Sequence, residues 1–159
     1  QIVVPLLANK GLYAELPEGR SDFCLMASGG FSISSGDASL STKYLLGLLN
    51  STLLFWYLRQ ISNIFRGGWI TCTKQYVGQL PIRRIDFTDP AEKSAHDEIV
   101  KMVEEMLGLQ KQCQQAEAGK EDVRFSLQKR IEALDKEIDA RVYRLYGLTE
   151  EEIKIVEGR

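Results

Sequence analysis

The chain has 159 residues, of which 44% are hydrophobic and 26% charged, and its formal net charge is −2. This is an ordinary globular composition, which excludes a wholly disordered tail. The length fits one domain, or one small domain with an appendage.

Charge is unevenly distributed along the sequence. Residues 38–85 contain no Asp or Glu, whereas both flanking stretches are net acidic. The same stretch holds six basic residues, Lys43, Arg59, Arg66, Lys74, Arg83 and Arg84. Because a polyanion responds to the local field rather than to the mean charge, this stretch is the candidate surface for nucleic acid.

The first 36 residues are predicted to form short strands joined by glycine- and proline-containing turns. The candidate strands are Ile2–Leu7, Leu12–Leu16, Phe23–Met26 and Phe31–Ser34. Because the chain starts at Gln1, without Met, and enters an apolar run at once, we expect a fragment of a longer protein.

A single buried helix is predicted from about Leu40 to Arg59, because leucines and aromatic residues crowd all its faces. Its most apolar part is shorter than the roughly 20 residues of a membrane span, so we expect no membrane partner. Within it, Asn50-Ser51 is expected to satisfy buried polar groups or to bend the helix.

After Gly67-Gly68, residues 69–72 are predicted to form a strand, and Thr73 is placed to cap a short helix that reaches Gln79. Pro81 disfavours helix at the residue before it, so the chain is expected to leave this helix in an extended conformation.

The remaining sequence predicts an antiparallel helical hairpin followed by a short helix. Asp89-Pro90-Ala91-Glu92 combines an N-cap acid, a first-turn proline and a Glu at the third position, as in a capping box. Apolar residues then recur three or four apart on both sides of Gly119. Gly147 is the expected C-terminal cap, and Thr149 is expected to open the last helix.

The fold class predicted from these elements is mixed, α+β. A small β-rich module with the buried helix 40–59 is expected over residues 1–86, and the helical hairpin and C-terminal helix over 87–159. The hairpin's leucines are expected to pack mainly on each other. A dimerising or partner-binding coiled coil is the alternative.

Cysteine and histidine usage gives no sign of a metal site. Cys24, Cys72 and Cys113 lack CxxC spacing, and His96 is the single histidine. We therefore expect neither zinc ligands nor a disulfide framework, and a reducing cytoplasm as the location.

Several short motifs together resemble a known family. They are the run YLLGLLNS at 44–51, Trp56-Tyr57, Gly67-Gly68-Trp69, QLPI at 79–82 and EIDARVYRLYGLTEEEI at 137–153. In this combination the chain is similar to the TaqI-like C-terminal specificity domain. That domain is the target-recognition part of adenine-N6 DNA methyltransferases and of fused type IIG restriction–modification enzymes. The resemblance is good over residues 40–157 and weak over 1–39.

Two features qualify this resemblance. Arg83 stands where the family often has a second proline, which leaves the path of this segment open. A looser similarity exists to the specificity subunits of type I restriction systems, in which a recognition module precedes a helical spacer.

The resemblance implies that the chain binds double-stranded DNA and presents a target adenine to a catalytic domain of the same polypeptide. S-adenosylmethionine is then the expected cofactor of the parent protein. This chain has no adjacent prolines and no glycine-rich motif between a strand and a helix. In this family a motif with two adjacent prolines holds the flipped base, and a glycine-rich motif binds S-adenosylmethionine. Because this chain lacks both motifs, we expect no catalytic residue, cofactor or metal within it.

The predicted DNA-binding residues are Arg66, Gly67, Gly68, Trp69, Thr73, Lys74 and Arg84. Arginine on a glycine-flexed loop reaches phosphates or pairs with guanine. Trp69 is a candidate to stack on bases, although an aromatic residue that opens a strand more often belongs to the core. Strand alternation sends Arg83 and Arg84 to opposite faces, so at most one is expected to hold the backbone.

The rival hypothesis is a protein-interaction module. In it the helical hairpin docks a partner or forms a dimer, and the middle stretch is only core.

Overall fold

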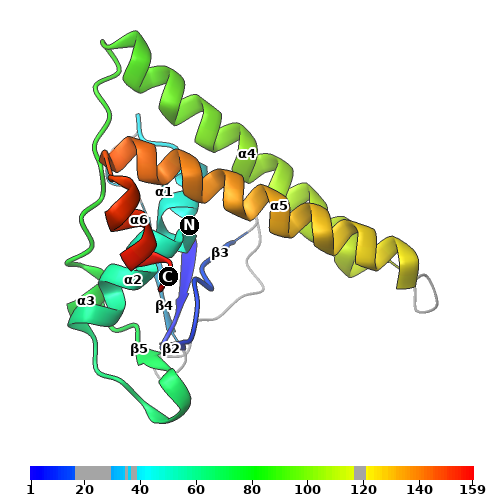
Figure 1. Cartoon of the computed structure of the whole chain (residues 1–159), viewed down its shortest axis with the longest axis horizontal. Coiled ribbons are helices and arrows are strands. Elements are labelled where there is room, and N and C mark those ends of the chain that lie inside the picture. Colours follow the sequence, from blue (N-terminus) through cyan, green and yellow to red (C-terminus); the bar gives the residue numbers. More distant parts are fainter. Residues whose placement is uncertain (17–29, 35, 37–38, 117–120) are drawn as a thin grey trace.

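The computed structural model of the chain describes residues 1–16, 30–34, 36, 39–116 and 121–159. Small antiparallel sheets pack with helices, two of which are long (Figure 1), so the predicted α+β class is confirmed. The predicted strand Phe23–Met26 and the predicted break at Gly119 lie outside the described residues. In chain order the elements are β1 (Ile2–Pro5), β2 (Leu7–Ala8), β3 (Ala14–Glu15), β4 (Gly30–Ile33), α1 (Thr42–Asn50), α2 (Thr52–Ile61), the 3₁₀ turn η1 (Arg66–Gly68), β5 (Ile70–Thr71), α3 (Lys74–Val77), α4 (Pro90–Gln115), α5 (Glu121–Tyr146) and α6 (Glu150–Val156).

The strands form two small antiparallel sheets. β1 is central in the order β3-β1-β4, and Ile2 and Val4 alternate with half-buried neighbours so that both are fully buried. The predicted strand Ile2–Leu7 divides in two, because β2 leaves this sheet and pairs with β5, with Leu7 opposite Thr71. The N-terminal run therefore links both sheets.

The predicted single helix 40–59 is wrong: it is two helices that meet at Ser51. Ser51 has extended backbone angles (φ −64°, ψ 149°) and is 3% exposed. Its hydroxyl donates to Leu48 O at 2.6 Å and accepts from Leu54 N at 3.3 Å, so it closes α1 and caps α2. A serine that hydrogen-bonds nearby backbone competes with the helical ladder.

Asn50 connects this break to the strand region. Its Oδ1 accepts from Tyr13 N at 2.9 Å and its Nδ2 donates to Tyr13 O at 3.0 Å. The Asn50 amide thus supplies the two backbone hydrogen bonds that a neighbouring strand would otherwise make with Tyr13. The expectation that Asn50-Ser51 satisfies buried polar groups or bends the helix is confirmed in its first part, and in place of a bend the helix is divided at Ser51.

Asp139 of α5 caps α2 from a distant part of the sequence. Its carboxylate accepts from Thr52 N at 2.8 Å and from the Thr52 hydroxyl at 2.5 Å. Burial raises the pKa of the Asp139 carboxyl above its ordinary value, and the hydrogen bonds from Thr52 partly oppose this effect.

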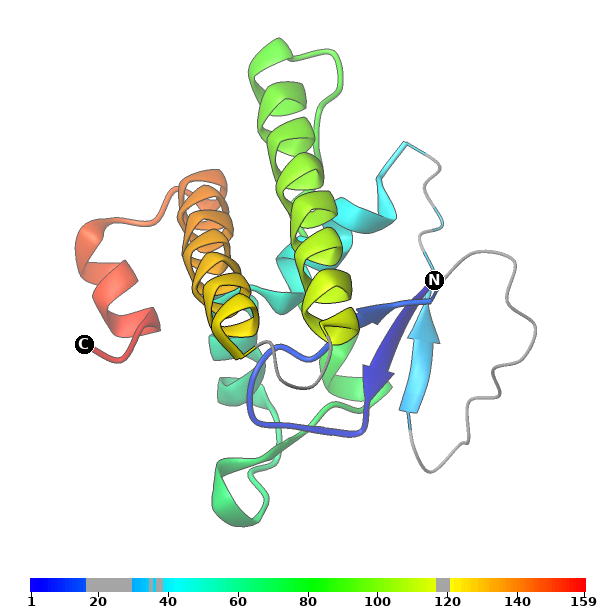
Figure 2. The same cartoon turned by 90° about the vertical axis from the view of Figure 1, so that its right-hand side faces the viewer.

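α4 and α5 form the predicted antiparallel hairpin (Figure 2). Arg130 pairs with Glu105 at 2.8 Å, and Arg141 with Glu98 at 2.9 Å, so the two helices run in opposite directions. The hairpin also packs on α1. A Cβ added at Gly47 of α1 would lie 2.9 Å from Cγ2 of Val103 in α4, so α1 and α4 approach each other closely at this glycine.

The predicted helix ends are largely confirmed. Asp89 Oδ1 accepts from Ala91 N at 2.8 Å. Gly147 (φ +69°) ends α5, with Leu148 N bonded to Tyr143 O at 3.0 Å, as in a Schellman motif. Thr149 and Glu152 form a capping box.

The capping box predicted at Asp89 does not close. Glu92 instead accepts from Asp86 N at 2.7 Å, because Asp86 lies within its reach on the preceding segment.

None of the helices in the described part of the chain is long and apolar enough to cross a membrane. The core is continuous between the strand-bearing residues and the helical hairpin, since Ile2, Tyr44 and Ile99 are all fully buried members of it.

Replacing Asn50 by alanine is expected to lower the free energy of unfolding by about 1–3 kcal/mol, because the buried backbone groups of Tyr13 lose their partners. Urea unfolding followed by circular dichroism measures this. Asn9, which is exposed, supplies the matched control: Asn9→Ala is expected to change stability by less than about 0.5 kcal/mol. Equal effects at both positions would contradict the role of Asn50.

Asp139 is expected to make stability pH-dependent. Because its folded pKa is raised, the folded state binds more protons than the unfolded state between the two pKa values. Its contribution is therefore fully present below about pH 4, the unfolded pKa, and is lost as the pH rises through the folded value.

The free energy of unfolding of wild type relative to Asp139→Asn should accordingly decrease as the pH rises from about 4 through the folded pKa of Asp139. Urea unfolding at a series of pH values measures this difference. Glu137→Gln removes a carboxylate from the exposed surface of the same helix and is the control. A difference that stays constant or grows with pH would show that the Asp139 pKa is not raised.

Candidate nucleic-acid interface

Residues 62–72, here called the projecting hairpin, form an antiparallel turn-back between α2 and α3. Phe65 N donates to Trp69 O at 2.5 Å, Ile64 bridges to Ile70, and Thr71 N donates to Asn63 O at 3.1 Å. These bonds continue the pairing from the base to the turn. The hairpin is therefore an ordered element rather than a loose loop.

Two glycines make the turn. Gly67 has φ +73° and ψ 21°, and Gly68 has φ +79°. Both lie in the left-handed region, which L side chains rarely adopt. A Cβ at Gly68 would meet no atom within 4 Å, so the backbone angle, and not lack of space, requires glycine there.

The base of the projecting hairpin is fixed in the core. β5 pairs with β2, Cys72 N donates to Leu6 O at 2.8 Å, and Ile70 and Cys72 are fully buried. Burial raises the pKa of the Cys72 thiol to about 11. In both views the turn points away from α4 and α5 (Figures 1 and 2).

The tip of the hairpin exposes large apolar side chains. Ile64 is 73% exposed, Phe65 58% and Trp69 38%. Trp69 is therefore not a core residue, although that alternative is commoner for an aromatic residue at a strand start. Sequence reasoning missed Ile64 and Phe65. Their only signal was their place next to Arg66-Gly67-Gly68, since isolated apolar residues after a helix are equally typical of core.

The other predicted contacts in this region lie on both sides of β5. Arg66 opens the turn, and only its backbone is described. Thr73 occupies the N-cap position of α3 without a capping bond from its side chain. The Lys74 ammonium lies 5.8 Å from the centre of the Phe31 ring of β4, at cation–π distance.

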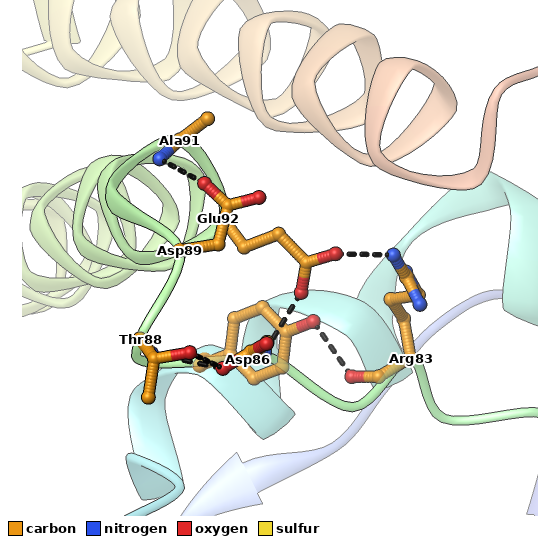
Figure 3. Close-up of polar contacts among 7 residues, drawn as sticks. Arg83, Asp86, Thr88, Asp89, Ala91 and Glu92 are labelled. Carbon is orange, nitrogen blue, oxygen red and sulfur yellow. Dashed lines mark hydrogen bonds and ion pairs between the residues drawn. The ribbon is translucent and has the colours of Figure 1, made fainter.

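Residues 80–89, here called the strap, connect α3 to α4 and are held on the helices. Arg83 pairs with Glu92 at 2.7 Å (Figure 3). Its carbonyl accepts from the Tyr44 hydroxyl at 2.9 Å, and its N–H donates to the Tyr146 hydroxyl at 3.1 Å. Tyr146 also donates to Pro81 O at 2.7 Å. The strap thus joins α1, α4 and the end of α5.

The second half of the strap is folded onto the start of α4. Thr88 donates to Asp86 from its backbone N–H at 2.9 Å and from its hydroxyl at 2.6 Å (Figure 3), and these bonds lower the pKa of Asp86. His96, 5% exposed, lies between Tyr44 and Phe87, with ring centres 4.8 and 5.1 Å away. His96 is therefore a packing residue of this junction.

Arg83 and Arg84 are both exposed and differ in their side-chain partners. Among the residues that the structure describes, no ion pair or hydrogen bond involves its side chain, whereas Arg83 is engaged by Glu92. Only one of the two is thus available to a ligand. Arg84 lies on the strap, so the predicted set divides between two places: residues 66–74 around the projecting hairpin, and Arg84 on the strap.

Comparison with known proteins places this surface in a family context. Residues 24–82 match the model of the TaqI-like C-terminal specificity domain. The resemblance seen in the sequence is confirmed. The matched residues include α1, α2, the projecting hairpin and α3, and the match ends at Ile82 on the strap. Residues 137–153, which also carried the resemblance, lie outside this match.

A curated relative is the type II restriction enzyme and methyltransferase RM.Eco57I of Escherichia coli. It is 29% identical over 101 residues, which are 62% of this chain. The aligned part is 10% of that protein, so the chain corresponds to a small fraction of its length. No solved structure matches the chain.

Gly67→Ala is expected to lower the free energy of unfolding by about 1–2 kcal/mol, because alanine is strained at a left-handed φ. The matched control is Gly108→Ala, inside α4, where an added Cβ meets no atom within 4 Å. That change is expected to raise stability by about 0.5–1 kcal/mol, because alanine favours helix. Thermal and urea unfolding of both variants measure the sign of each change in the free energy of unfolding. Stabilisation by Gly67→Ala would contradict the turn geometry.

Proposed function

We propose that this chain is the DNA-recognition part of a restriction–modification enzyme. In this role it binds duplex DNA and presents a target adenine to a catalytic domain of the same polypeptide. The match to a specificity domain and the similarity to RM.Eco57I support this proposal. S-adenosylmethionine is the cofactor proposed for that catalytic domain, and none is proposed for this chain.

One observation carries the proposal. Part of the acid-free stretch, residues 62–72 of 38–85, forms a projecting hairpin that is fixed at its base and open at its tip. A duplex that approaches this tip meets no carboxylate from the hairpin, from α2 or from α3. Such a surface suits a polyanion, and its glycine turn lets the backbone approach closely.

The rival function, a protein-interaction module, draws less support from the geometry. Much of the apolar surface of α4 and α5 is used internally, since Ile99, Val103, Ile131 and Ile138 are buried in the core, although Val123 and Phe125 at the start of α5 are exposed. The helical hairpin of α4 and α5 therefore has less apolar surface to offer a partner than its sequence pattern indicates. A helix-mediated dimer stays a prediction.

Salt-dependent DNA binding tests the proposal. Fluorescence anisotropy with a labelled duplex is expected to show weak affinity that falls steeply between about 50 and 200 mM salt, because phosphate contacts release counterions. The affinity is expected to be weak because half of the clamp, the catalytic domain, is absent. No binding to any duplex at low salt would overturn the proposal.

The same titration tests individual cations. Arg66→Ala is expected to weaken binding and to reduce the slope of log affinity against log salt by about one. Arg124→Ala removes an exposed cation from α5, away from the projecting hairpin, and is expected to leave the slope unchanged. Unchanged affinity after Arg66→Ala would exclude a DNA contact by that residue.

A further inference from the structure

The apolar tip of the projecting hairpin is not explained by packing. Ile64, Phe65 and Trp69 lie within six residues and are 73%, 58% and 38% exposed. The proposed function assigns contacts to Arg66 and the glycines but gives no role to Ile64 or Phe65. Clustered exposed apolar side chains on a soluble domain mark an interaction site.

The tip presents these side chains from a defined backbone. Phe65 and Trp69 stand opposite each other, joined by the bond from Phe65 N to Trp69 O. Opposed residues of an antiparallel pair project to the same face, so the two aromatic rings share one face of the hairpin. Gly67 lies beside the Trp69 ring, since a Cβ added to it would lie 3.7 Å from Trp69 Cδ1.

The charges around the tip favour an anionic occupant. Residues 1–14 and 38–85 contain no acid, and they supply β2, α2, β5 and α3, the elements at the base of the hairpin. Arg59 and Lys74, both exposed, flank it in the sequence. An apolar tip whose base elements carry Arg59 and Lys74 and no carboxylate complements a base stack lined by phosphates.

We propose that Phe65, with Trp69 opposite it on the same face, inserts against the base stack of duplex DNA and opens a base step. This inference rests on the proposed function, because it needs the chain to bind a duplex. Apolar side chains wedged at a step unstack the bases without reading a sequence. The wedge would therefore add affinity and distort the duplex, while the cations of the same surface set the salt dependence.

The experiment uses the full chain and a duplex in which 2-aminopurine replaces every adenine of one strand, since this base brightens when it is unstacked. Wild type is expected to raise the emission on binding. Phe65→Ala is expected to abolish the rise and to weaken binding by at least about fivefold, the low end of what one stacked base contributes. The slope against salt should stay unchanged, because no phosphate contact is lost.

Phe125→Ala is the matched control, because Phe125 is 63% exposed on α5, away from the tip. It is expected to bind and to brighten the duplex as wild type does. In a Trp56→Phe background, Trp69 is the single tryptophan, and its emission is expected to be quenched by the duplex. Circular dichroism confirms that the variants are folded.

The outcomes separate the two proposals. If wild type binds with a steep salt dependence but neither brightens the duplex nor responds to Phe65→Ala, the wedge is overturned and the proposed function stands. If wild type binds no duplex, both fail. If Phe65 is needed instead for binding neutral phosphatidylcholine vesicles, and not for the duplex signal, the tip is a membrane contact and the wedge is overturned.

Discussion

The break between α1 and α2 is the constraint on which the rest of the structure depends. Three consecutive polar residues there make three different connections. Asn50 supplies both hydrogen bonds to Tyr13, Ser51 ends one helix and caps the next, and Thr52 binds Asp139 of α5. Asn50 and Thr52 thus join α1 and α2 to other parts of the core, and Ser51 joins the two helices to each other. Since α2 leads directly into the projecting hairpin, the angle set at Ser51 also directs the tip.

The strap is the second fixed junction, and it decides which cations remain accessible. The Glu92 carboxylate accepts hydrogen bonds from the Arg83 side chain and from the Asp86 N–H. It therefore does not complete a capping box at Asp89. Buried packing of His96 against Tyr44 and Phe87 holds the same segment down. Arg83 therefore serves the fold, whereas the Arg84 side chain has no ion-pair or hydrogen-bond partner within the described part of the chain. The acid-free stretch thus contains fewer available cations than its sequence indicates.

The turn of the projecting hairpin followed from local sequence, and the exposure of its tip did not. Gly67-Gly68 predicted a turn beside Arg66, and that turn exists. The exposure of Ile64 and Phe65 was not predictable, because a short apolar run after a helix reads equally well as core. What decides it is the pairing of β5 with β2, residues far apart in sequence, which buries Ile70 and leaves the turn beyond the core.

The sequence by itself determined the element types, the mixed class, the start of α4, the end of α5 and the charge segregation, because capping and periodicity act within a few residues. Asp89, Gly147 and Thr149 were predicted for this reason. The division of the middle helix at Ser51, the engagement of Arg83 and the exposed tip were decided only by tertiary structure. Asp139 lies 87 residues from Thr52, and no local pattern announces such a contact. The physical reason is that burial and pairing depend on partners that only the fold brings together.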